Sequence, residues 1–254
     1  MKIIEMFGLP YSGKSTMINI VKKNNKRTKT TNYRNTVYDY LFKSKEISSV
    51  DYLFLRLSER LREKTHKNNN LKKAFYCLIK LLVLIIPANK EIINNKINEI
   101  YLLNSKKNKV FLNFLIQLNK KYNFEIDKVL EWIKLEITGY NLSKKSKNDY
   151  SLNSEGIVQR CLSIIMRINI AKKDIKKFLK LCPKPDVLII FDDKKKISNF
   201  LKNNKKISIK KKTFLQNYKF LKENIKKFFR GTLIISSQDK KTLETLKKGK
   251  NYEY

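Results

Sequence analysis

The chain has 254 residues, of which 42% are hydrophobic and 11% aromatic, so it can build a buried core and is not globally disordered. Its 57 lysines and arginines against 22 acidic residues give a net charge of +35, which alone points to nucleic acid or an anionic membrane surface. The basic residues are mostly lysine and come with many asparagines and isoleucines, as the codons of an AT-rich genome would supply. We therefore discount nucleic acid as the partner.

The cysteine and histidine content excludes two kinds of site. Cys77, Cys161 and Cys182 are far apart and odd in number, so neither a disulfide framework nor a zinc site is expected. We expect Cys161 and Cys182 in the core and the lone histidine, His66, at the surface, which argues against a Cys–His or Ser–His–Asp catalytic site. These features indicate a reducing, cytoplasmic environment.

Neither a signal peptide nor a membrane span is evident. The first apolar stretch is short and runs into a glycine loop. The longest apolar run, residues 74–87, is interrupted by Lys80 and is shorter than the roughly 18–20 residues that a span needs. We interpret this run as a buried helix, while a peripheral position at a membrane surface stays open.

Hydrophobic patterns predict an α/β chain with a long helical middle. A strand at 2–7 leads through a glycine loop to a helix at 14–23, and a short polar strand is expected near 26–32. The helical segments that follow are predicted near 34–44, 47–65, 71–86, 89–103, 107–121 and 126–138. The α/β pattern then returns, with strands at 148–153, 187–191 and 231–236 and helices at 156–170, 211–229 and about 239–247.

Residues 8–16, GLPYSGKST, fit the Gly-x-x-x-x-Gly-Lys-Ser pattern of a Walker A loop, between a strand and a helix. Gly8 and Gly13 let the loop curl so that its N–H groups face phosphate oxygens, and the helix adds its positive N-terminus. In this pattern Lys14 reaches the β- and γ-phosphates and Ser15 ligates Mg²⁺. ATP and Mg²⁺ are thus the expected cofactors, and the nucleotide-binding set is completed by Tyr11, Ser12 and Thr16.

Three segments resemble, in the same order, those of P-loop nucleoside and nucleotide kinases of the thymidylate-kinase-like group, including the type encoded near surface-polysaccharide genes. The segments are GLPYSGKST, SEGIVQR at 154–160 and KPDVLIIFDD at 184–193. The resemblance implies a three-layer α/β P-loop NTPase with a parallel sheet. We expect one domain over residues 1–254, in which the helical pattern at about 34–145 forms a large insert for the acceptor. The resemblance implies a lid at about 194–210.

The second segment departs from the family pattern, because Ser154 stands where the family has an acid. The resemblance implies that Glu155 assists Mg²⁺ or accepts the proton of the acceptor hydroxyl, whereas an ordinary acid in the first turn of a helix is the alternative. It also implies that Arg160 binds the acceptor or a phosphate, and helical spacing places Arg160 on the face of Glu155, whereas a plain surface arginine is the alternative. The expected catalytic set is Lys14, Glu155 and Arg160, with Ser15 and Glu155 at the metal.

The third segment ends in Asp192 and Asp193, at the carboxyl end of a strand, where ligands bind in open α/β sheets. Asp192 is the better candidate to lie near the phosphates, and a cap or lid-hinge role is the alternative. The lid that follows has no arginine before Arg230, so none of its lysines is assigned to catalysis; they are Lys194, Lys195, Lys196, Lys202, Lys205 and Lys206. By position alone, Ser236, Ser237 and Gln238 are candidates to contact adenine.

Three functions stay open, of which we favour the first. A kinase would phosphorylate a nucleotide, a nucleoside or an intermediate of glycan assembly. A nucleotide-dependent ATPase or switch would act on a nucleic-acid or protein partner, although the chain has no Asn-Lys-x-Asp sequence. A degenerate ATP-binding protein is suggested by Ser154 and by the lysine-only lid.

Overall fold

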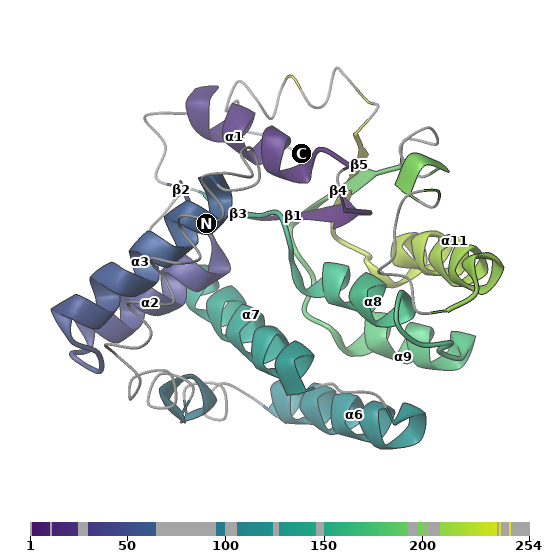
Figure 1. The fold of residues 1–254 in the computed structure, drawn as a ribbon, viewed down its shortest axis with the longest axis horizontal. Helices are drawn as coiled ribbons and strands as arrows, with labels where there is room; N and C mark the ends of the chain where they lie inside the picture. Colours follow the sequence, from purple (N-terminus) through teal and green to yellow (C-terminus); the bar gives the residue numbers. More distant parts are fainter. Residues whose placement is uncertain are drawn as a thin grey trace.

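A computed structural model describes residues 2–10, 12–24, 30–64, 95–99, 106–123, 127–145, 150–192, 198–200 and 209–237, together with positions 202, 239 and 244. Within these residues the chain forms a parallel sheet of five strands, in the order β2-β3-β1-β4-β5, with helices on both faces (Figure 1). The strands are β1 (Lys2–Gly8), β2 (Thr30–Thr31), β3 (Tyr150–Asn153), β4 (Val187–Phe191) and β5 (Leu233–Ser236).

The first strand lies at the centre of the sheet. It pairs with β3 on one side, where Lys2 is opposite Tyr150, and with β4 on the other, where Gly8 is opposite Phe191. From β1 the chain crosses to β2 at one edge, whereas from β4 it continues to β5 at the other edge. Loops that leave adjacent parallel strands in opposite directions open a crevice at the carboxyl ends of the strands. The loop after β1 therefore begins at the position where this architecture places ligands.

The helices are α1 (Lys14–Asn24), α2 (Tyr33–Lys43), α3 (Ser49–Lys64), α6 (Lys106–Tyr122), α7 (Asp127–Lys145), α8 (Ile157–Ile165), α9 (Lys172–Leu181) and α11 (Lys211–Phe228). Side chains of β1 alternate between the two faces of the sheet. Ile4 and Met6 pack with Ile18 and Val21 of α1. Phe7 points to the other face, into a larger core shared by α6, α7, α8, α9 and α11.

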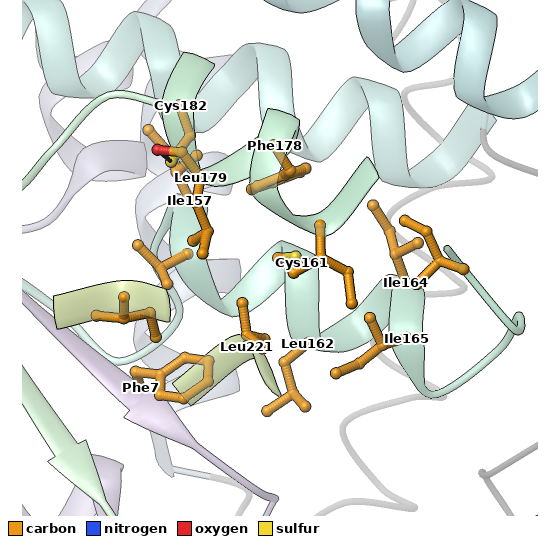
Figure 2. Close-up of a cluster of buried hydrophobic side chains, with 14 of the residues drawn as sticks. Phe7, Ile157, Cys161, Leu162, Ile164, Ile165, Phe178, Leu179, Cys182 and Leu221 are labelled. Carbon is orange, nitrogen blue, oxygen red and sulfur yellow. Dashed lines mark hydrogen bonds between the residues drawn. The ribbon is translucent and has the colours of Figure 1, made fainter. Parts of the chain in front are cut away.

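The larger core is built around α8, which is buried over nearly its whole length. Figure 2 shows Cys161 and Leu162 of α8 in the middle of this core, with Phe178 of α9 and Leu221 of α11 nearby. Phe7 of β1 lies at one side of the cluster, and Ile164 and Ile165 lie at the other. Cys161 and Cys182 are buried free thiols, as the sequence predicts. Burial raises the pKa of the Cys161 thiol, so this residue is a packing residue and not a nucleophile.

The described part of the long middle of the chain is mostly helical, in α2, α3, α6 and α7. It is not a separate layer, because α6 and α7 contribute to the larger core. Phe111 of α6, for example, meets Phe178 of α9 edge to face, with 5.1 Å between ring centroids. The helix expected at 71–86 lies outside the described residues, and of the one expected at 89–103 only residues 95–99 are described, as helix.

Two expectations are wrong in detail. The predicted helix at 156–170 ends at Ile165, and a separate helix, α9, which the sequence analysis did not predict, follows at Lys172. Apolar spacing in the segment predicted as a helix at 107–121 also places Val110 with Phe111 on one inward face, but Val110 is 53% exposed whereas Phe111 is buried. Of the predicted closing helix only positions 239 and 244 are described, and most of the lid lies outside the described residues. Among the residues that are described, no helix is long and apolar enough to cross a membrane.

Candidate functional site

The loop after β1 makes close contacts that only glycine permits. Gly8 has φ +156°, and a Cβ on it would lie 2.8 Å from the Cβ and carbonyl oxygen of Phe191 on β4. Gly13 has φ +103° and immediately precedes the first residue of α1. Both glycines of the pattern thus occupy backbone conformations that other residues rarely adopt. The loop turns sharply from the central strand into the N-terminus of α1, which favours anions.

The side chain of Lys14 folds back over this loop. Its Nζ donates hydrogen bonds to the carbonyl oxygens of Gly8, at 2.6 Å, and Leu9, at 2.7 Å. Only 8% of Lys14 is exposed, and this burial lowers its pKa to about 8, while the negative charge of Glu155 acts in the opposite direction. The ammonium is therefore held inside the loop, next to Ser12, whose Oγ lies 3.5 Å away.

The other residues of the predicted nucleotide set have contrasting positions. Ser15 and Thr16 are exposed in the first turn of α1, whereas Ser12 is buried. A hydroxyl at the start of α1 is accessible to a ligand, as a metal-binding role for Ser15 requires. Tyr11 lies outside the described residues.

Glu155 and Arg160 meet, as their spacing predicts. Nη2 of Arg160 lies 3.4 Å from Oε2 of Glu155, at the start of α8. The carboxylate side chain of Glu155 is 45% exposed, whereas that of Arg160 is 4% exposed. Glu155 is thus accessible to a ligand or a metal. Arg160 is buried beneath it and forms an ion pair with its carboxylate.

Arg160 has a second and closer partner that sequence reasoning missed. Its Nε lies 3.0 Å from both carboxylate oxygens of Glu136, on α7, and its Nη2 also donates to Glu136. Trp132 of α7 covers the guanidinium, 5.0 Å from its ring centroid. Burial disfavours the charge of Arg160, but Glu136 and Glu155 outweigh it and raise the pKa. The signal in the sequence was an acid at an inward position of α7, three residues beyond the buried Ile133.

Glu5 is a further buried acid that was not predicted. It lies on β1, where Tyr33 Oη donates to its Oε1 at 2.7 Å and the N–H of Val158 points to its Oε2 at 3.4 Å. Burial raises its pKa to about 7, against the effect of the Tyr33 hydrogen bond and with a smaller contribution from the charge of Glu136. Gly156 lies directly over the carboxylate, where a Cβ would be only 2.1 Å from it. The signal was the single acid within the apolar strand sequence KIIEMF.

The start of α8 is therefore tied directly to β1. Glu5 lies at the N-terminal N–H groups of α8, and Gln159 of α8 accepts a hydrogen bond from the N–H of Gly8 at 3.1 Å. These two contacts bring the SEGIVQR segment alongside the glycine loop. The described residues of segments 2–16 and 154–160, which are remote in sequence, thus lie side by side.

Two acids of the third segment, KPDVLIIFDD, make hydrogen bonds that join structural elements. Asp192 accepts hydrogen bonds from Lys222 of α11 at 2.9 Å and from Ser236 of β5 at 3.2 Å, so its carboxylate joins the end of β4 to these two elements. Asp186 accepts from the N–H of Ile3, so it joins β4 to β1. Asp193, Gln238 and the lid lysines except the exposed Lys202 lie outside the described residues.

Comparisons of the chain with protein-family models, with curated proteins and with solved structures gave no match. Within the described residues, no group of three or more histidine, cysteine or acidic side chains could hold a metal ion alone. The site is therefore defined by its own geometry: a glycine loop with a buried lysine, exposed hydroxyls at a helix N-terminus, and one accessible carboxylate.

Proposed function

We propose that the chain is a P-loop phosphotransferase that moves the γ-phosphoryl group of ATP to a small acceptor. The observation that supports this most is the placement of GLPYSGKS at the carboxyl end of the central strand, with Lys14 folded into the loop. Loop N–H groups and the N-terminus of α1 bind the phosphates in this arrangement, and the ammonium of Lys14 shifts from loop carbonyls to phosphate oxygens.

The residues around the loop suit Mg²⁺, which prefers oxygen ligands and keeps several waters. The exposed hydroxyl of Ser15 and the accessible carboxylate of Glu155 would hold it, the latter directly or through water. The ion would neutralise charge on the phosphates. Glu155 can instead accept the proton of the acceptor hydroxyl, and Arg160, fixed by Glu136, positions Glu155 for either role.

One observation favours a second candidate, an ATP-binding protein without transfer activity. The guanidinium of Arg160, which the family resemblance assigns to the acceptor or a phosphate, is buried and bound by Glu136. With Ser154 in place of an acid, the charges that the described glycine loop and the start of α8 offer for catalysis are those of the buried Lys14 and the accessible Glu155. ATP binding without ADP release would support this second candidate.

The direct test is an assay for ADP release across a panel of nucleosides, nucleotides and sugar-linked acceptors. We expect one acceptor class to stimulate release, and Lys14→Ala to reduce that rate by at least about a hundredfold, because positioning and charge neutralisation carry this chemistry. Lys43→Ala, an exposed lysine at the end of α2, is the matched control and should keep the wild-type rate. Full activity in Lys14→Ala would exclude the proposed mechanism.

A further inference from the structure

The charge of the protein is unevenly distributed over its helices. The helices α6, α9 and α11 carry five, five and six lysines, and their only acidic residues are Asp174 and Glu223. In α2, α3 and α7 the charges nearly balance: α2 has two basic residues and one acidic residue, and α3 and α7 each have four basic and three acidic residues. Codon supply alone would enrich lysine on all exposed helices and would not deplete acids from three of them. The uneven distribution therefore needs a separate explanation.

The three basic helices form one continuous surface. Lys177 of α9 lies over the ring of Phe114 on α6, and Lys172 and Lys176 of α9 lie over Phe220 of α11, at 5.2, 5.4 and 5.7 Å. These contacts place α9 between α6 and α11, as Figure 1 also shows. Asp174 adds little negative potential here, because Lys121 and Tyr122 bind its carboxylate at 2.5 and 2.7 Å.

We propose that this surface, the exposed lysines of α6, α9 and α11, binds an anionic lipid bilayer; we call it the lysine face. Lysines close to an anionic leaflet each contribute a similar, additive attraction, and a row of them across three helices can contact many headgroups together. The lysine face is separate from the glycine loop and α1, since α1 packs on the opposite face of the sheet.

The side chains on the lysine face favour lipid over nucleic acid. Its three helices contain no arginine, the residue best suited to phosphate and base recognition in nucleic acids. The ring of Phe220 is already covered by lysines, so it is not an open platform for a base. Val110, Ile116 and Leu215 are 53%, 38% and 39% exposed among these lysines. Aliphatic side chains gain free energy at a headgroup–acyl boundary and gain nothing against a phosphate backbone.

The test is flotation of the full chain with phosphatidylcholine vesicles that contain about 30 mol% phosphatidylserine, against vesicles of phosphatidylcholine alone. We expect binding only to the anionic vesicles, with a loss of more than about tenfold in affinity between about 0.1 and 0.5 M salt. Equal binding to both vesicle types, or no binding to either, would overturn the proposal.

Two triple variants with the same change in net charge distinguish binding through the lysine face from attraction by the total charge of the protein. Changing Lys173, Lys180 and Lys226 to Glu on the lysine face should weaken vesicle binding by about a hundredfold or more, since each lysine contributes about fivefold. Changing the exposed Lys43 and Lys145 of the balanced helices and Lys45 of the turn after α2 to Glu changes the charge by the same amount and should cost less than about tenfold. Equal losses in the two variants would overturn the proposal.

Two additions keep the result interpretable. Thermal unfolding checks that both variants are folded, and Lys→Gln changes at the same lysine-face positions replace the Glu variant if it is not. A mixed-sequence DNA duplex of about 30 base pairs is titrated in parallel. If the duplex binds through the lysine face and displaces the protein from vesicles at similar concentration, the surface is a nucleic-acid site and the lipid proposal is wrong.

Discussion

At the scale of single residues, two side chains have strongly shifted pKa values, one on β1 and one in the glycine loop. Glu5 is a buried acid with a pKa of about 7, and Lys14 is a buried base with a pKa of about 8. Both side chains make hydrogen bonds that stabilise the site. Glu5 accepts one from the start of α8, and Lys14 donates one to a carbonyl of the glycine loop. Both residues therefore make the site sensitive to pH near neutrality.

Glu5 should make the folded state less stable as the pH rises. Its pKa is about 7 when folded and about 4.5 when unfolded, so the folded chain holds an extra proton between these values and loses stability across this window. Glu5→Gln removes the effect, so it should gain up to about 3 kcal/mol relative to wild type between pH 5 and pH 8. Urea unfolding at both pH values measures this, and parallel pH profiles for the two proteins would contradict it.

Lys14 should take up a proton when ATP binds. At pH 8 it is about half protonated in the free protein, and nearby phosphates would raise its pKa further. Affinity for ATP should therefore weaken as the pH rises through 8, by up to about tenfold per unit. Calorimetric titration at pH 8 in two buffers of different ionisation enthalpy counts the protons. An uptake near zero, or the same uptake in Lys14→Ala as in wild type, would refute this role.

At the scale of elements, the docking of α8 against α7 depends on a buried ion pair. Arg160 and Glu136 are 3% and 2% exposed, so removing one partner leaves the other buried with its charge poorly compensated. Glu136→Gln should lower the free energy of unfolding by about 3 kcal/mol, as urea denaturation would show. The double change of Glu136 to Leu and Arg160 to Met should cost less than Glu136→Gln, because it leaves no buried charge. If the double variant is the less stable of the two, the pair itself is a net source of stability.

The elements also show how far the sequence predicts this structure. The strand VLIIF and the strand–loop–helix around GLPYSGKS are local patterns, and both lie where they were expected. The helix α9 was missed because only a few residues of this lysine-rich segment are buried and no Gly or Pro separates it from α8. The pairing of Arg160 with Glu136 could not be predicted, since it joins residues 24 positions apart on different helices. Spacing predicted only the local contact of Arg160 with Glu155.

At the scale of the whole molecule, two surfaces on different sides of the sheet carry separate proposals. The glycine loop and α1 offer a phosphate cradle, and the helices α6, α9 and α11 offer a lysine face. The net charge of +35 raises the local concentration of any anion, ATP included, so weak binding alone proves neither site. Each proposal therefore needs a control variant of equal charge.

The most direct test of the phosphate cradle is a calorimetric titration of MgATP into wild type, Lys14→Ala and Lys43→Ala at pH 7. We expect wild type and Lys43→Ala to bind alike, because Lys43 is an exposed residue of α2 outside the loop. Lys14→Ala should bind at least about tenfold more weakly, since it loses charge-assisted hydrogen bonds of about 1.5–3 kcal/mol each. Equal affinity in all three proteins, or no binding by wild type, would contradict the proposed function.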